Sequence, residues 1–169
     1  KPDSMEICFI PDGDYAAYLE NEYGLVAKKG NFIDVNGKVL GEHRGIVHYT
    51  VGQRKGLGIT FGKPMFVKEI RPETNEVVLS DNEGLFSTRV VAERVNFMAE
   101  TREEIEALNK TYMAKIRYNH KGGDCKLSFD GERVVAEFLE PQRASAPGQT
   151  LVVYNEAGEV VCGGRIVRS

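Results

Sequence analysis

Paired strand-like segments separated by two-residue turns are the feature that most constrains how this chain can fold. Asn36-Gly37 lies within residues 32–40, and Asp130-Gly131 lies within residues 125–138. Asn-Gly or Asp-Gly between runs rich in β-branched and aromatic residues favours a tight antiparallel hairpin. At Asn36-Gly37 we expect a two-residue turn with positive φ at both positions. These signals predict a chain built largely from antiparallel strands.

The rest of the chain continues this pattern after one leading helix. Residues 12–24 combine an acidic candidate N-cap, helix formers and a final glycine, which indicates one short helix. Residues 99–110 are polar and fit either a helical turn or a loop. Further strand candidates are residues 45–51, 65–70, 76–79, 89–97 and 112–118, and a third hairpin of residues 151–154 and 160–167. The predicted fold is mainly β: a short leading helix followed by two small antiparallel β domains, with their boundary within residues 81–89.

Bulk composition limits the kinds of partner and compartment. Of the 169 residues 41% are hydrophobic, which is enough for a packed core, and 22 basic against 25 acidic residues give a net charge of −3. This balance does not indicate an obligate nucleic-acid binder, so any RNA-binding surface must be a local patch. Three cysteines without zinc-ligand spacing fit a reducing cytoplasm. We expect no membrane span and no leader, and the start at Lys1 suggests a piece of a longer protein.

The cysteines offer one candidate for chemistry. Cys8 precedes the predicted helix start, whose free N–H groups favour a thiolate, although the acidic residues around it oppose one. Cys8 is therefore either a reactive thiol or a small buried hydrophobe. Cys125 and Cys162 lie inside strand patterns, which indicates a structural role.

Residues 41–58 form the segment richest in polar and glycine residues, and we call it the glycine-rich segment. It interleaves five glycines with the polar side chains His43, Arg44, His48, Gln53, Arg54 and Lys55. Glycine lets the backbone approach a ligand closely, and basic side chains suit phosphate. The alternative is a basic turn whose glycines serve backbone geometry. The spacing is not that of a P-loop.

A second basic cluster occupies residues 115–123. The pattern places Lys115 and Arg117 on one strand face, with Tyr118 near the strand end. Arginine and tyrosine together can hold a phosphate and stack on a base. The alternative is a solvated strand face, and residues 147–149 (Pro-Gly-Gln) likewise fit either a turn or a weak site.

Several motifs together resemble the tRNA-specific 2-thiouridylase family in order and spacing. They are DS and EICFI (residues 3–10), GEHRG (41–45), TVGQRKGLG (50–58), RY (117–118) and PGQ (147–149). The resemblance implies an N-terminal PP-loop ATPase domain, a small central β domain and a β-barrel like those of translation factors. On this basis residues 1–24 are the catalytic-cysteine segment and helix at the end of the first domain, 25–85 the central domain and 86–169 the barrel.

The resemblance also implies a reaction. Cys8 would carry a persulfide received from a sulfur-relay protein or a cysteine desulfurase, and pass its sulfur to uridine C2. ATP would first adenylate the C2 oxygen, and a second cysteine of the N-terminal domain would complete the cycle through a disulfide. Neither Cys125 nor Cys162 matches that second cysteine, and no SGGxDS-like ATP loop occurs in this sequence. We therefore expect no thiolation by this chain alone, no ATP site within it and no metal ligated by it.

The resemblance assigns tRNA contacts to Arg117, Tyr118 and Gln149. It places Gln53, Arg54 and Lys55 in the signature loop, and for these residues and His43 we expect a role in RNA binding or between domains. Met5-Glu6 departs from the smaller residues that many members carry there. Two other functions remain open: a non-catalytic tRNA-binding β module with a structural Cys8, and a protein-interaction barrel without an RNA role.

Overall fold

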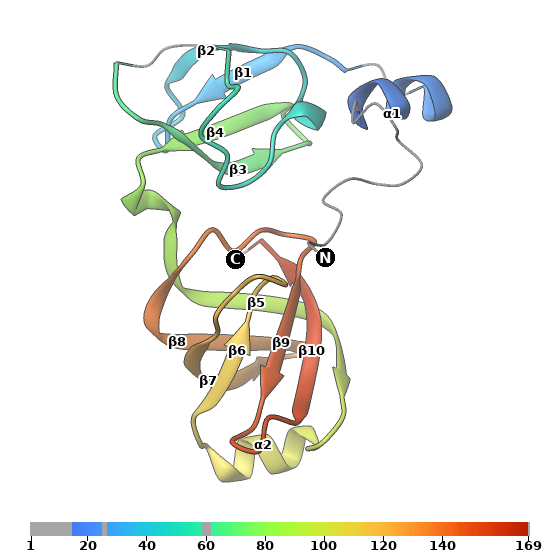
Figure 1. Cartoon of the computed structure of the whole chain (residues 1–169), viewed down its shortest axis with the longest axis vertical. Helices are drawn as coiled ribbons and strands as arrows, with labels where there is room; N and C mark the ends of the chain where they lie inside the picture. The colour runs from blue at the N-terminus through green and yellow to red at the C-terminus, as the bar shows by residue number, and fades with distance from the viewer. Residues whose placement is uncertain (1–14, 25–26, 59–61, 169) are drawn as a thin grey trace, which may run out of the picture. The chain divides into compact units, whose positions relative to one another are not determined.

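Two units follow one another along the chain, residues 1–80 and residues 81–169 (Figure 1). The computed structural model describes residues 15–24, 27–58 and 62–168. The predicted mainly β fold with a short leading helix is confirmed. Within the described residues, no helix is both long and apolar enough to cross a membrane.

The first unit contains a helix and a four-stranded sheet. Helix α1 (Tyr15–Tyr23) lies within the predicted range, and Gly24 follows it with a φ of 63°. The strands are β1 (Gly30–Ile33), β2 (Val39–His43), β3 (Phe66–Arg71) and β4 (Glu76–Ser80), in the order β2-β1-β4-β3. One pairing differs from the antiparallel expectation, because β1 and β4 run parallel. The long connection from β2 to β3 brings β4 beside β1, a non-local pairing that strand patterns cannot reveal.

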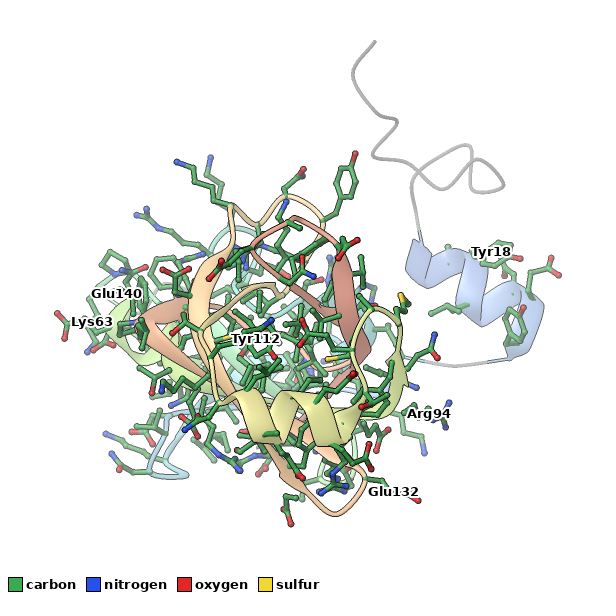
Figure 2. All side chains as sticks on the ribbon, turned by 90° about the horizontal axis from the view of Figure 1, so that it is seen from below. Tyr18, Lys63, Arg94, Tyr112, Glu132 and Glu140 are labelled. Atoms are coloured by element: carbon green, nitrogen blue, oxygen red, sulfur yellow. The ribbon has the colours of Figure 1, made fainter. Side chains whose placement is uncertain are left out.

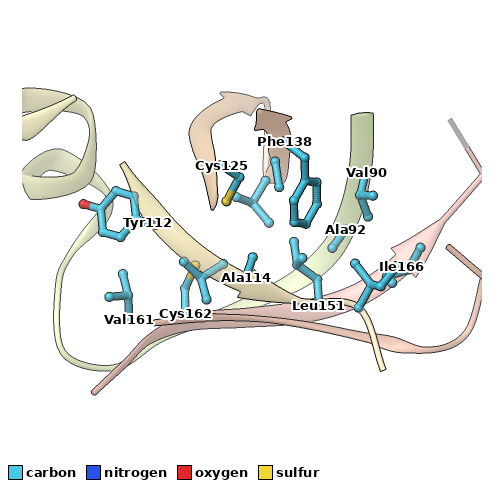
Figure 3. Packing of buried hydrophobic residues seen from close by; sticks show 14 of the residues in the cluster. Val90, Ala92, Tyr112, Ala114, Cys125, Phe138, Leu151, Val161, Cys162 and Ile166 are labelled. Atoms are coloured by element: carbon cyan, nitrogen blue, oxygen red, sulfur yellow. The ribbon is translucent and has the colours of Figure 1, made fainter. Parts of the chain in front are cut away.

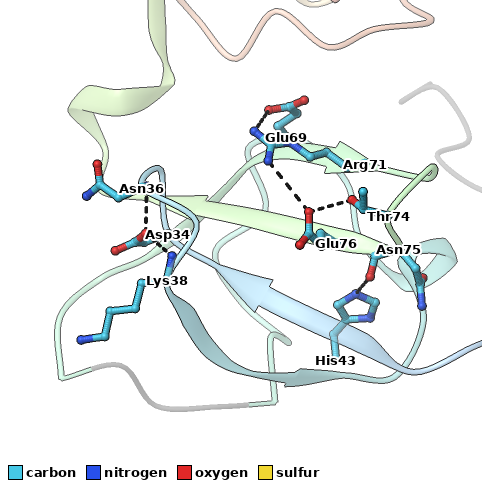
Figure 4. A network of polar contacts seen from close by, with 9 residues as sticks. All are labelled: Asp34, Asn36, Lys38, His43, Glu69, Arg71, Thr74, Asn75 and Glu76. Carbon is cyan, nitrogen blue, oxygen red and sulfur yellow. Dashed lines mark hydrogen bonds and ion pairs between the residues drawn. The ribbon is translucent and has the colours of Figure 1, made fainter.

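The turn between β1 and β2 is longer than the predicted two residues. The Asp34 N–H donates to the Lys38 carbonyl (2.9 Å), so the turn runs from Asp34 to Lys38. Asp34 Oδ1 accepts the backbone N–H groups of Asn36 (2.8 Å) and Lys38 (2.9 Å), as Figure 4 shows. Only Gly37 of the pair has a positive φ, at 83°. The prediction of positive φ at Asn36 was wrong, because the Asp34 carboxylate closes the turn.

Residues 45–51 do not form the predicted strand. They contain the 3₁₀ turn η1 (Ile46–His48), and Gly45 has a φ of 129°. Tyr49 instead packs its ring against Phe32, with centroids 5.2 Å apart. The apolar residues that suggested a strand therefore serve the core of the first unit, which comprises Phe32, Tyr49, Leu57, Met65, Val67, Val77 and Leu79.

The second unit is a closed six-stranded barrel in which all pairings are antiparallel. The strands are β5 (Phe86–Phe97), β6 (Tyr112–Lys115), β7 (Gly123–Asp130), β8 (Arg133–Arg143), β9 (Thr150–Tyr154) and β10 (Val160–Val167). Both predicted hairpins, β7–β8 and β9–β10, are confirmed. Strand β6 ends three residues before the predicted limit, so Arg117 and Tyr118 lie in a turn and not on a strand face. The short turn η2 (Glu83–Leu85) precedes β5.

Helix α2 (Arg102–Leu108) settles the open choice for residues 99–110 in favour of a helix. Thr101 and Glu104 form a reciprocal capping box at its start, which satisfies two otherwise unpaired N–H groups. Beside it, Glu100 accepts hydrogen bonds from Lys110 Nζ and Tyr112 Oη, both at 2.7 Å. Burial acts to raise the pKa of Glu100, but these hydrogen bonds outweigh it and the pKa is lowered. Figure 2 views the barrel from the α2 end, with Tyr112 inside and Arg94 and Glu132 at its periphery.

The barrel interior holds both described cysteines. Cys125 and Cys162 are fully buried free thiols among side chains such as Ala114, Phe138 and Leu151 (Figure 3). Burial raises the pKa of Cys125 to about 12 and that of Cys162 to about 11. Both therefore remain protonated and unreactive at neutral pH, as the predicted structural role requires.

Candidate functional site

His43 is buried and holds the start of the glycine-rich segment in place. Its Nδ1 accepts the Gly45 N–H (3.0 Å), so Nε2 carries the proton and donates to the Asn75 carbonyl (3.1 Å; Figure 4). The side chain is 2% exposed, and its ring packs edge-on against Phe32 and Tyr49. Burial lowers the pKa of His43, which keeps the imidazole neutral. The ring is thus committed to the fold and is not presented on the surface.

Gln53 closes the turn in the middle of the segment. Its Oε1 accepts the Thr50 N–H (2.9 Å), and its Nε2 donates to the Lys55 carbonyl (3.0 Å). Two backbone hydrogen bonds tie this turn to Val67 of β3. The Gly52 N–H donates to the Val67 carbonyl (2.7 Å), and the Val67 N–H donates to the Gln53 carbonyl (2.9 Å). Both ends of the Gln53 amide are engaged, so this side chain shapes the loop.

The cations of the segment point outward. Arg44, Arg54 and Lys55 are exposed, and the Arg54 guanidinium lies 5.9 Å from the centre of the Phe66 ring. Arg44 and Lys55 have no ion-pair partner among the described residues. A groove of about 470 Å³ lies beside Arg44, and it is lined by Lys29, Glu42, His43, Arg44, Tyr49, Gly56, Leu57 and Gly58.

Arg117 and Tyr118 lie in the turn that follows β6. One nitrogen of the Arg117 guanidinium, Nη1, donates to the Arg143 carbonyl (2.9 Å) and lies 3.5 Å from that of Ala144. Its other nitrogens, Nε and Nη2, meet no acceptor in the part of the chain that the structure describes. Tyr118 is 85% exposed. The turn therefore presents an anchored guanidinium next to an exposed aromatic ring.

Gln149 lies at the same end of the barrel. Gly148, with a φ of 89°, donates its N–H to the Ile166 carbonyl (2.9 Å), and the Ile166 N–H donates to the Gln149 carbonyl (2.8 Å). These bonds fix the backbone and leave the Gln149 side chain exposed. Because β6 and β9 are antiparallel, with Lys115 opposite Val152, the end of β6 adjoins the start of β9. We call this end of the barrel, with Arg117, Tyr118 and Gln149, the tyrosine end.

His120 supports this turn, a role that sequence reasoning did not assign. Its N–H donates to the Arg117 carbonyl (3.0 Å), and its Nε2 lies 2.9 Å from Gln142 Oε1. Gln142 is 9% exposed and donates from Nε2 to the Glu140 carbonyl (2.6 Å), so Oε1 is its acceptor and His120 Nε2 is the donor. Burial, together with the positive charge of Arg117, lowers the pKa of His120. Gln142 lies beyond the predicted hairpin of residues 125–138, so no signal in the sequence identified this pair.

Other candidates fall elsewhere. Cys8 lies outside the described residues. Within the described ranges, no three His, Cys, Asp or Glu side chains gather into a group that could hold a metal ion. The predicted site residues therefore divide between two units: His43, Gln53, Arg54 and Lys55 in the first, and Arg117, Tyr118 and Gln149 in the second.

Comparison with known proteins gives matches over both units. Residues 17–81 match the family described as tRNA methyl transferase PRC-barrel domain, and residues 87–167 the family described as aminomethyltransferase beta-barrel domain. The chain is 51% identical over 165 residues to tRNA-specific 2-thiouridylase MnmA of Lachnoclostridium phytofermentans, covering 97% of this chain and 45% of that protein. It is 47% identical over 169 residues to the proteins of the same name from Carboxydothermus hydrogenoformans and Clostridioides difficile, covering 98% and 99% of this chain and 45% of each relative. The chain thus spans less than half the length of these curated relatives.

Proposed function

The chain belongs to the tRNA-specific 2-thiouridylase family, and on that premise we propose that it serves the ATP-dependent transfer of persulfide sulfur to C2 of the wobble uridine of tRNA. In this proposal the two β units bind tRNA in the cytoplasm and Cys8 carries the sulfur. The sulfur comes from a relay protein or a cysteine desulfurase. No residue of this sequence is assigned to ATP.

The tyrosine end is the observation that supports tRNA binding most directly. A phosphate oxygen can accept from the free donors of Arg117, whose position is fixed by the Arg143 carbonyl. An unpaired base can stack on Tyr118, because the exposed ring offers a face without first having to leave a core. Gln149 adds an amide that can donate and accept. Arg54 and Lys55 of the first unit supply further phosphate contacts.

The proposed chemistry divides one difficult substitution into two steps. Adenylation by ATP turns the C2 oxygen into a leaving group that departs with AMP. The terminal sulfur of the Cys8 persulfide attacks C2 and displaces AMP. The thiolate of the second cysteine then attacks Cys8 Sγ, which breaks the S–S bond, releases the sulfur on C2 as 2-thiouridine and leaves a disulfide between Cys8 and the second cysteine. The identity to 2-thiouridylases supports this assignment to Cys8.

The first experiment is tRNA binding by this chain across a salt series, for the parent, Arg117→Ala and Lys55→Ala. Each phosphate contact releases counterions, so each variant should bind more weakly and lower the salt slope by about one. Lys126→Ala and Lys38→Ala, exposed cations on β7 and in the β1–β2 turn, are matched controls that should bind as the parent does. Binding that ignores salt, or variants indistinguishable from the controls, would contradict the proposal.

The second experiment addresses Cys8 in the full-length protein. Cys8→Ser should abolish thiolation and leave tRNA affinity within about twofold, because a hydroxyl cannot carry a persulfide. The competing view, a tRNA-binding module with a structural Cys8, predicts slow alkylation of Cys8 under native conditions and a loss of stability in the variant. Retained thiolation by Cys8→Ser would exclude the catalytic role.

A further inference from the structure

We propose that the groove of the first unit binds a single phosphate group, with Arg44 as its charged ligand and the backbone of residues 56–58 as its neutral donors. This inference rests on the proposed function in one respect, because it takes the phosphate to belong to the tRNA backbone. It assigns the contact to Arg44 and to main-chain groups, whereas the RNA-binding or interdomain role expected of the signature loop rested on side chains.

The first observation is a row of backbone donors without acceptors. The N–H groups of Arg54, Lys55, Gly56, Leu57 and Gly58 form no hydrogen bond within the part of the chain that the structure describes. Consecutive N–H groups of this kind form anion-binding concavities in other proteins, since each is a partial positive charge that needs a partner. The side chain of Gln53 holds the start of this row, so the donors are positioned before a ligand arrives.

The second observation is how open the groove is above this row. Gly56 and Gly58, which line it, have φ values of 74° and 76°, a left-handed conformation that glycine adopts without strain. A Cβ built on Gly58 would meet nothing within 4 Å, and one on Gly56 would meet only Gln53 Nε2 at 3.7 Å. The main chain is therefore reachable by a ligand oxygen.

The third observation is the balance of charge around the groove. Lys29 and Glu42 form an ion pair across its rim, with Nζ and Oε1 2.9 Å apart, so these two charges largely cancel. His43, also in the lining, is neutral and has both nitrogens engaged. Arg44 is exposed and has no ion-pair partner among the described residues, which leaves its guanidinium as the net charge of the lining. Lys55 adds a second cation close by in sequence. The groove suits one anionic oxygen group, bound by a planar fork on one side and main-chain N–H groups on the other.

The test compares Arg44→Gln with Lys38→Gln, an exposed lysine of the same unit that does not line the groove. Arg44→Gln should raise the tRNA Kd about three- to tenfold and lower the salt slope by about one, whereas Lys38→Gln should change neither. Arg44→Lys should restore the slope, because it restores the charge. Amide signals of residues 56–58 should shift when tRNA is added to the parent and stay in place in Arg44→Gln.

Titration with inorganic phosphate distinguishes failure of the proposed phosphate site from failure of the proposed tRNA-binding function. Arg44→Gln binding tRNA as tightly as Lys38→Gln, with unshifted amides, would overturn the inference while leaving the proposed function intact. A parent chain that fails to bind tRNA but shows Arg44-dependent shifts of residues 56–58 with inorganic phosphate would support an anion site for a free phosphate and count against the proposed function. Absence of both responses would overturn both.

Discussion

The glycine-rich segment and the tyrosine end use their polar residues in opposite ways. In the glycine-rich segment, His43 and Gln53 turn inward and bind the protein's own backbone. At the tyrosine end, Tyr118 and Gln149 are exposed, and Arg117 uses one nitrogen for anchorage. The more distinctive motif in the sequence is thus the one whose central polar side chains serve folding. A specific residue pattern can reflect the needs of a loop as readily as those of a ligand.

The difference has a structural cause. Between β2 and β3, the described residues 44–58 and 62–65 lie outside regular strands, so many of their backbone groups lack a ladder partner. Buried backbone groups must be paired, and here side chains such as His43 and Gln53 do part of that work. The turns at the tyrosine end are short connections of a closed barrel, whose ladders already satisfy most of the backbone. Tyr118 and Gln149 are accordingly exposed at this end.

The largest expected effect is that of removing His43. His43→Ala should destabilise the first unit by about 3–5 kcal/mol, because it deletes a ring packed on Phe32 and leaves the Gly45 N–H and the Asn75 carbonyl unpaired. Urea unfolding followed through amide signals of β1 and β2 measures this. Arg44→Ala, the exposed neighbour, should stay within about 0.5 kcal/mol. Equal stability of His43→Ala and Arg44→Ala would contradict this prediction, since it would mean that His43 does not hold the glycine-rich segment in place.

The next effect concerns affinity. Tyr118→Ala should weaken tRNA binding by about 1–3 kcal/mol, or roughly five- to 150-fold in Kd, through loss of base stacking. Tyr118→Phe keeps the ring and should bind like the parent. If Tyr118→Phe is as weak as Tyr118→Ala, the hydroxyl and not the ring face makes the contact.

A pH series tests whether histidines support both regions from within. His43 and His120 have pKa values lowered below 6.5, mainly by burial, so the unfolded chain takes up more protons than the folded chain as pH falls. Stability should be constant above about pH 7 and decline below 6.5, by at most about 1.4 kcal/mol per pH unit for each histidine. Urea unfolding at pH 7.5, 6.5 and 5.5, followed separately in the two units, measures it. His120→Gln should reduce the pH dependence of stability in the barrel and leave that of the first unit unchanged. An unchanged pH dependence in the barrel would show that His120 is not the titrating group.

Individual helices and hairpins were predicted from the sequence more accurately than the pairing of strands that lie far apart in the chain. The hairpins β7–β8 and β9–β10 and helix α1 follow from local signals, because turn residues and residue periodicity act over a few positions. The parallel pairing of β1 with β4 escaped prediction, since it depends on where a long connection leads. The predicted strand at residues 45–51 failed because Tyr49 packs into a core with residues of β1, β3 and β4, which lie far from it in sequence.

Prediction of the candidate site met the same limit. Sequence could name Arg117, Tyr118 and Gln149 but could not show that one barrel end gathers them, which is a consequence of the β6–β9 pairing. Nor could it show which way each polar side chain points. His43 and Arg44 are adjacent in the chain, yet one is 2% exposed and the other lies on the surface.

The smallest effects come from a matched pair of glutamines, and they bear most directly on the comparison. Gln53→Ala should cost about 1 kcal/mol of stability in the first unit, since it leaves the Thr50 N–H and the Lys55 carbonyl without their side-chain partner. Gln149→Ala should leave stability unchanged and weaken tRNA binding about two- to tenfold, the worth of one neutral hydrogen bond. Urea unfolding measures the stability of both variants, and tRNA titration measures their affinity. We expect Gln149→Ala to change affinity alone and Gln53→Ala to lower stability, with any loss of affinity in Gln53→Ala following from its loosened loop. A Gln53→Ala variant that keeps its stability but loses affinity would place an RNA contact on the Gln53 side chain itself, because the amide would then be bonding to the ligand and not to its own loop.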